Sequence, residues 1–96
     1  MNVFKEKDCF VYSGKRKLML DFFLKRKKGL PNQIIANVPI SRANLYLILH
    51  EMVEKKIIFK IKLKITGWQQ RYSFEINANL NELNNIKLKE GDIIKV

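Results

Sequence analysis

The chain has 96 residues, a length that allows one compact domain and leaves little room for a second. It is 47% hydrophobic and 29% charged, which is typical of a globular protein and excludes a disordered tail. Nineteen lysine and arginine residues stand against nine acidic residues, so the net charge is +10.

Apolar runs and cysteine content exclude further classes. No run approaches the ~18 apolar residues of a membrane span, and the N-terminus lacks the apolar core of a signal peptide. We therefore expect a cytoplasmic protein with no membrane partner. Cys9 is the single cysteine and His50 the single histidine, so we expect no internal disulfide, no metal site and no cofactor.

The positive charge is unevenly distributed along the chain. Residues 1–30 carry nine basic and three acidic side chains, whereas residues 77–96 carry three of each. Such a surplus favours a polyanionic partner, nucleic acid first and an acidic membrane surface or acidic protein second. The richness in lysine, isoleucine and asparagine is also typical of an AT-rich coding sequence, which by itself would supply part of the charge.

The first elements in chain order are a short apolar run and a helix. Residues 9–12 fit either a strand or an apolar lead-in to the helix that we expect over residues 15–28. Ser13 is a suitable N-cap, and Gly29 stands where a left-handed residue would end the helix. The helical period predicts one apolar face with Leu18, Met19, Phe22 and Phe23 and a second with Leu20 and Leu24. A helix with two apolar faces is covered on two sides.

Two further helices are expected, over residues 32–37 and from residue 42 to about residue 55. The second has to stop before Pro39, because the residue preceding a proline is pushed out of helical geometry. Ser41 is the predicted N-cap of the third helix. The period assigns Leu45, Ile48, Leu49 and Met52 to the core. It turns outward the side chains of Arg42, Ala43, Asn44, Tyr46, Leu47, His50 and Glu54.

Alternation of period two then predicts a β-hairpin, with strands over residues 59–65 and 71–76 and a turn at residues 66–70. We expect one face of the first strand to be buried, with Phe59, Ile61, Leu63 and Ile65. The other face would be a row of lysines, Lys60, Lys62 and Lys64. On the second strand we expect Tyr72, Phe74 and Ile76 to point inward. In the tail, one helical turn around Leu80 and Leu83 is followed by a second small hairpin, residues 86–88 with 93–96.

This order of elements resembles the winged helix-turn-helix regulators of bacteria, archaea and their viruses. The resemblance is carried by residues 34–45, by Ile48 and Leu49, and by residues 52–58. After the turn the family commonly has leucine, serine and a basic residue, which are Ile40, Ser41 and Arg42 here. Its helix commonly closes in Glu-Lys-Gly-Leu-Ile, which corresponds to residues 54–58.

The resemblance implies an α+β winged helix-turn-helix core over residues 13–77, with three helices and a β-hairpin wing. Residues 78–96 would be a short C-terminal β extension that serves as a small hairpin or a dimerisation element.

The resemblance also implies a function, namely sequence-specific binding of double-stranded DNA by a transcriptional regulator. The third helix would enter the major groove, where Arg42 can reach a guanine or a phosphate and Asn44 can pair with adenine. The recognition-helix candidates are Ser41, Arg42, Ala43, Asn44, Tyr46, Leu47 and His50. The wing candidates are Lys60, Lys62, Lys64, Trp68 and Arg71. Lys15, Arg16 and Lys17 are candidates for contacts to the DNA backbone. The protein would lie in the cytoplasm, at the nucleoid, or in the host cytoplasm if a virus encodes it.

Association and alternative functions remain open from the sequence. Leu20, Leu24, Leu47, Val53 and residues 1–12 form surplus apolar surface that predicts a homodimer. The first alternative is a winged helix that docks onto protein in a replication or transcription assembly. The second is binding of single strands or RNA through the lysine row with Phe10, Trp68 and Tyr72. We expect no enzyme, because the sequence has no Gly-rich phosphate loop, no metal-ligand cluster and no nucleophile–base set.

Overall fold

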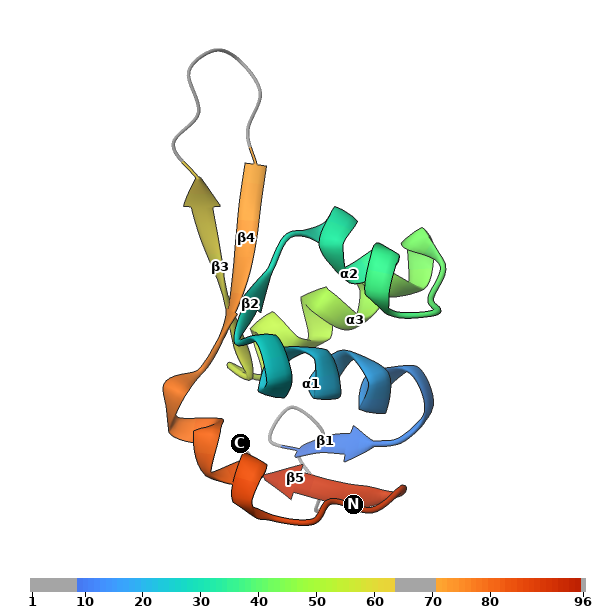
Figure 1. Cartoon of the computed structure of the whole chain (residues 1–96), viewed down its shortest axis with the longest axis vertical. Coiled ribbons are helices and arrows are strands. Elements are labelled where there is room, and N and C mark those ends of the chain that lie inside the picture. The colour runs from blue at the N-terminus through green and yellow to red at the C-terminus, as the bar shows by residue number, and fades with distance from the viewer. Residues whose placement is uncertain (1–8, 64–70, 96) are drawn as a thin grey trace, which may run out of the picture.

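The computed structural model describes residues 9–63 and 71–95. These residues form a small mixed α and β domain with two antiparallel sheets (Figure 1). The helices are α1 (Gly14–Arg26), α2 (Pro31–Asn37), α3 (Arg42–Glu54) and the 3-10 helix η2 (Ala78–Asn85). The strands are β1 (Cys9–Tyr12), β2 (Lys28–Gly29), β3 (Ile58–Leu63), β4 (Arg71–Ile76) and β5 (Asp92–Lys95). Residues 1–8, 64–70 and 96, which include Lys64, Ile65, Trp68 and the predicted turn, lie outside the described part.

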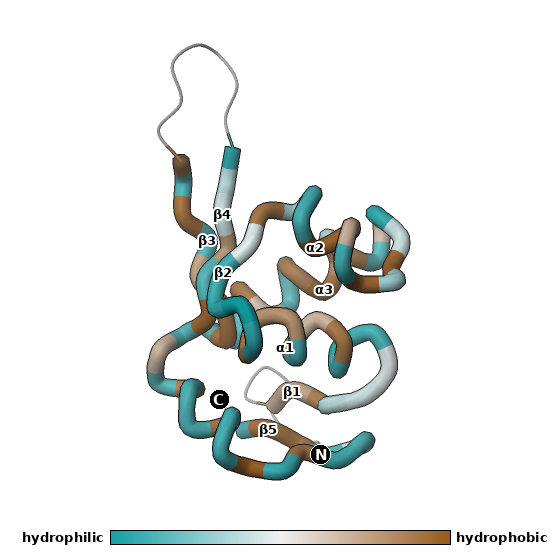
Figure 2. The backbone as a smooth tube through the Cα atoms, viewed as in Figure 1, coloured by the Kyte–Doolittle hydropathy of each residue, from teal (hydrophilic) through white to brown (hydrophobic). Residues whose placement is uncertain are grey.

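Helix α1 is the central layer of the domain. Helices α2 and α3 and the β2–β4–β3 sheet lie on one side of it, and the β1–β5 sheet lies on the other (Figure 1). Its buried residues are Met19, Leu20, Phe22, Phe23 and Leu24. The prediction that this helix is covered on two sides is confirmed. Figure 2 shows the apolar segments of α1 enclosed between these layers, with the polar segments of η2 at the outside.

The tail folds differently from the sequence prediction. Residues 86–88 form no strand, and β5 pairs antiparallel with β1 at the other end of the chain, with Phe10 opposite Ile94. The predicted small C-terminal hairpin is therefore wrong. The long-range pairing brings Phe10, Tyr12 and Ile94 into the core together with Leu20 and Leu24. The tyrosine hydroxyl of Tyr12 also donates a hydrogen bond to Asp21 of α1.

This sheet removes most of the apolar surface on which the dimer prediction rested. Leu20 is 1% exposed, Leu24 8% and Phe10 0%, and Val53 is packed against the core. Of the described residues named for that purpose, Leu47 and Val11 are still exposed. The buried position of Phe10 also corrects its expected role in stacking on single strands.

The end of α1 shows why Gly29 is a glycine. The helix ends at Arg26, earlier than predicted, and Lys27 rather than Gly29 takes a positive φ of 71°. Residues Lys28–Gly29 form strand β2, with Gly29 opposite Phe74. A Cβ atom on Gly29 would lie 2.7 Å from Cε1 of Phe22. Close packing against that ring, and not a left-handed backbone, therefore excludes a side chain here.

Helices α2 and α3 follow the sequence prediction closely. Pro31 occupies the first turn of α2, where its missing N–H costs nothing, and the side chain of Gln33 accepts a 2.9 Å hydrogen bond from the Leu30 amide. The hydroxyl of Ser41 accepts a 3.2 Å hydrogen bond from the Asn44 amide, which confirms it as the N-cap of α3. The predicted core residues of α3 are all buried: Leu45, Ile48, Leu49 and Met52.

The end of α3 directs the chain into the second sheet. The Ile57 amide donates to Met52 O at 2.9 Å and the Lys56 amide donates to Val53 O at 3.1 Å. These two bonds are those of a Schellman motif, whose central residue needs a left-handed backbone. Lys56 supplies it with a φ of 59°, a position for which glycine is preferred. Ile57 and Ile58 then enter the core.

The β3–β4 hairpin is present, but the predicted faces of β3 are reversed. Residues directly opposite each other in an antiparallel pair share a face, and Ile58 lies opposite Ile76, Lys60 opposite Phe74 and Lys62 opposite Tyr72. The predicted inward positions of Phe74 and Ile76 are confirmed, because they are 5% and 8% exposed. Phe59 and Ile61 occupy the other face and are 46% and 37% exposed, so the prediction that they are buried is wrong.

The reversal has a physical cause. Ile58 is the first residue of β3 and is fully buried beside α3, so the alternation that starts from it puts Lys60 and Lys62 on the same face. Figure 1 shows the hairpin extending past the helices. Lys60 and Lys62 are exposed on this face, whereas Ile58 at the start of the strand is buried. In the part of the chain that the structure describes, no helix is long and apolar enough to cross a membrane.

Candidate nucleic-acid interface

The outward face of α3 carries the side chains that the sequence predicted to point away from the core. All seven recognition-helix candidates, from Ser41 to His50, are exposed. The apolar side chains among them are conspicuous: Leu47 is 69% exposed and Tyr46 is 48% exposed. Because Ser41 caps the helix, the first turn of α3 presents Arg42, Ala43 and Asn44 on a fixed backbone. These three side chains are open to a partner.

The hairpin lysines lie on the α3 side of the second sheet. Lys60 and Phe74 of the hairpin share a hollow of about 240 Å³ with Tyr46 and His50 of α3. The ammonium nitrogen of Lys60 is 4.2 Å from the centre of the Tyr72 ring, a cation–π contact. Lys60 of the predicted lysine row therefore adjoins the outward face of α3, which alternation alone did not indicate.

Among the described residues, no carboxylate forms an ion pair with Lys60, Lys62 or Arg71 at this junction. Arg42, in the first turn of α3, likewise forms no ion pair with a carboxylate within residues 9–63 and 71–95. His50 is the exception on α3, with Nε2 3.1 Å from Oε1 of Glu54. A surface with unneutralised cations next to an exposed helix face can bind phosphates by charge.

The three basic side chains at the start of α1 contact other segments of the same chain. Lys15 Nζ donates a 2.8 Å hydrogen bond to Pro39 O in the turn between α2 and α3. Arg16 Nε lies 2.7 Å from Oε1 of Glu51, and Lys17 Nζ lies 3.6 Å from Oε1 of Glu90. Their predicted contacts to a DNA backbone remain a prediction, and would have to compete with these interactions.

Glu51 anchors the back of α3. Its second carboxylate oxygen lies 2.6 Å from Lys55 Nζ, in addition to the contact with Arg16. Burial acts to raise the pKa of Glu51, but the hydrogen bonds from Lys55 and Arg16 outweigh it and hold the pKa below its ordinary value. Glu51 is therefore an ionised structural residue that ties α3 to α1.

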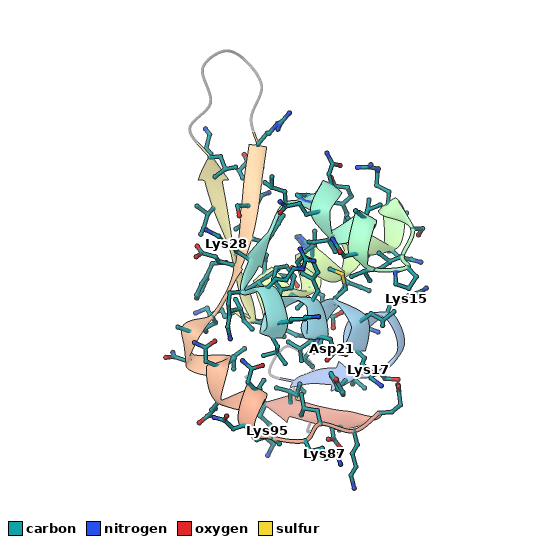
Figure 3. The ribbon with its side chains drawn as sticks, in the orientation of Figure 1. Lys15, Lys17, Asp21, Lys28, Lys87 and Lys95 are labelled. Atoms are coloured by element: carbon teal, nitrogen blue, oxygen red, sulfur yellow. The ribbon has the colours of Figure 1, made fainter. Side chains whose placement is uncertain are left out.

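Basic side chains lie on several sides of the molecule. Figure 3 places Lys15 and Lys17 at the start of α1 and places Lys87 and Lys95 near β5, away from the hairpin. The net charge of +10 is therefore not confined to one surface. Lys64 and Trp68, which the sequence assigned to the interface, lie outside the described residues.

Comparison with known proteins relates the fold to that of a solved structure. No protein-family model and no curated protein matches the chain. Among solved structures it is similar to a transcriptional regulator homologue from Pyrococcus horikoshii OT3, with a TM-score of 0.59 and 20% sequence identity. The match covers 73% of this chain and 68% of that chain. At this identity the likeness establishes a shared fold.

Proposed function

We propose that this chain is a winged helix-turn-helix protein that binds double-stranded DNA and regulates transcription. In this proposal α2 and α3 form the helix-turn-helix, α3 is the recognition helix and the β3–β4 hairpin is the wing. The orientation of Lys60 and Lys62 toward α3 carries the proposal, because it joins the cationic strand to the exposed helix face. A duplex with its major groove on α3 would then place phosphates near these lysines.

Two further observations support the proposal. The net charge of +10 favours a polyanionic partner. The protein with the similar fold is described as a transcriptional regulator homologue, which favours a regulatory role for this chain. We propose that the protein binds DNA without catalysing a reaction, a function that requires neither a cofactor nor a metal. We propose that it does so in the cytoplasm.

Binding measured against salt tests the proposal. Fluorescence anisotropy with a duplex, a single strand and an RNA hairpin should give the highest affinity for the duplex. The logarithm of the binding constant should fall linearly with the logarithm of salt concentration, because phosphate contacts release counterions. A sequence selected from a random duplex pool should bind more tightly than its scrambled version. Equal affinity for all three ligands, with no selected sequence, would exclude a regulator of this kind.

We also propose that the protein acts as a homodimer, since half-sites in DNA usually mirror a two-fold axis of the protein. Two exposed apolar pairs remain available for association. Phe59 and Ile61 lie on the outer face of the hairpin, and Val11 and Ile93 lie opposite each other on the outer face of the β1–β5 sheet. Light scattering at tens of micromolar would show a mass of two chains. A single-chain mass, with and without DNA, would exclude the dimer.

A protein-docking role is the second candidate, and the outer face of the hairpin favours it. Phe59 and Ile61 expose apolar surface that DNA bound on the α3 side would not cover. The substitution Phe59→Ser separates the two functions. It should leave duplex affinity unchanged if the hairpin touches DNA only with its lysine face, whereas it should abolish a protein contact made by the outer face.

A further inference from the structure

A hollow between the hairpin and the start of α2 has the composition of a ligand site. Its volume is about 290 Å³, at the small end of the range for small-molecule sites. Aromatic rings line it from two elements, Tyr46 from α3 and Tyr72 and Phe74 from β4. Pro31 adds an apolar wall at the start of α2. The hollow can therefore hold a flat, largely apolar group.

The charges at the hollow have one sign. Lys60 and Arg71 line it, and none of the described residues that line it is acidic. The contact of Lys60 with the Tyr72 ring holds its ammonium group at the hollow instead of leaving it extended in solvent. A ligand that combines a flat ring with a negative charge matches both features, because aromatic faces stack on rings and cations bind phosphate.

A nucleotide within an intact duplex matches the hollow poorly. Its base is stacked and paired inside the double helix, so that its edges are accessible in the grooves but its faces are not. An unstacked nucleotide offers a free ring and its phosphate together. Tyr46, 48% exposed at the edge of the hollow, is the most accessible ring for such a base.

We propose that this hollow binds one unstacked nucleotide, with its base against Tyr46 and Tyr72 and its phosphate near Lys60 and Arg71. The inference rests on the proposed function in that the ligand is nucleic acid. It adds that the protein distinguishes DNA containing an unpaired nucleotide from fully paired DNA. The same chemistry would accept a free nucleotide, so the experiment has to separate a free nucleotide from a nucleotide within a strand.

Three ligands distinguish these sources: thymidine 5′-monophosphate, a duplex with one unpaired thymidine, and the same duplex fully paired. We expect the unpaired thymidine to raise duplex affinity by about 5- to 150-fold, the range expected for stacking of one base on an aromatic side chain. If the monophosphate alone binds at the hollow, shown by NMR shifts of Tyr46 and Tyr72, and the unpaired base adds nothing, the site serves a free nucleotide. If neither adds affinity or shifts, the inference is wrong.

Variants locate the effect. Tyr46→Leu and Tyr72→Leu should each remove the preference for the unpaired nucleotide, measured as the ratio of the affinities for the two duplexes, so that any loss shared by both duplexes cancels. Phe59→Leu is the matched control, since this exposed aromatic residue lies on the opposite face of the same hairpin. Tyr46 is on the surface, so its variant should fold even where Tyr72→Leu does not. Retention of the preference in folded Tyr46→Leu and Tyr72→Leu would overturn the inference. Binding of the paired duplex without any preference would contradict this inference alone and leave the proposed function intact.

Discussion

Lys60 of β3 holds its ammonium nitrogen 4.2 Å from the centre of the Tyr72 ring on β4, on the side of the sheet that faces α3. The register of the hairpin explains this contact. Lys60 lies directly opposite Phe74, and Lys62 directly opposite Tyr72, so that both lysines share a face with aromatic residues. Lys60 and Lys62 therefore lie on the side of the hairpin that faces α3, where a ligand bound on α3 could contact them.

The first prediction concerns the phosphate contacts of the hairpin. Lys62→Glu should weaken binding to every duplex alike and reduce the slope of log affinity against log salt by about one unit or more, because a phosphate contact carries no sequence information. Lys87→Glu makes the same charge change near β5, away from the hairpin. Anisotropy titrations at several salt concentrations compare the two variants. Equal losses of duplex affinity in the two variants would mean that the net charge of the protein, and not the position of Lys62, determines the affinity.

A different outcome is expected for Asn44 in the first exposed turn of α3. Asn44→Ala should cost about 1–3 kcal/mol on the selected sequence and little on a scrambled duplex, since a two-point contact to adenine is lost. Asn84→Ala, an exposed substitution in η2, is the control. Titrations on the two duplexes provide the comparison. An equal loss on both sequences would show that Asn44 does not read a base.

Leu47 gives a third prediction, because this leucine is 69% exposed on the proposed recognition helix, where it can contact an apolar group of a partner. We expect that partner to be a thymine methyl group. Replacing thymine by uracil, one position at a time in the selected duplex, should lower affinity at one position by about 0.8 kcal/mol, the value of one buried methyl group. Leu47→Ala should remove that difference. If no uracil substitution changes affinity, Leu47 contacts protein, and light scattering of the variant would then show dissociation.

The sequence predicted best where several local signals coincide. In α3 the Ser41 cap, the helical period and the apolar core positions agree, and the structure confirms them together. Pairing between β1 and β5 could not be predicted in this way, because Cys9 and Lys95 lie at opposite ends of the chain and no local pattern links them. The sequence predicted that residues 86–88 pair with residues 93–96, and this pairing is absent from the described residues.

The candidate site was predictable only in part, for a related reason. Alternation in β3 correctly separates lysines from apolar residues, but it does not say which face meets the core. The burial of Ile58 decides that question, and it depends on where α3 ends. The exposed residues of α3 followed from its own sequence, whereas the proximity of Tyr46 to Lys60 required the fold.

Lys56 yields a prediction about stability. It has a φ of 59° at the Schellman motif that ends α3, where a side chain makes the backbone conformation unfavourable. Lys56→Gly should raise the free energy of unfolding by about 0.5–1 kcal/mol. Lys56→Ala removes the same charge but keeps a Cβ atom, so it should give no such gain. Urea unfolding followed by circular dichroism compares them, and a gain in both variants would attribute the effect to charge.

The last prediction is a pH dependence that originates at Glu51. Because hydrogen bonds from Lys55 and Arg16 outweigh burial, the pKa of this carboxyl group is below its ordinary value of 4.5 in the folded protein. A depressed carboxyl pKa contributes stability that is complete above the unfolded value and disappears as the pH falls through the folded value. Glu51→Gln should therefore destabilise the protein near neutral pH, and the difference from the unmodified chain should shrink as the solution becomes acidic.

Thermal unfolding of both proteins between about pH 3 and pH 7 measures this difference across the relevant range. Glu82→Gln, an exposed carboxyl group on η2, is the control and should show a much smaller difference at every pH. If Glu51→Gln destabilises the protein equally at the acidic and neutral ends, the ion pairs with Arg16 and Lys55 are not the cause. The contribution of Glu51 would then come from packing between α3 and α1, which does not depend on its charge.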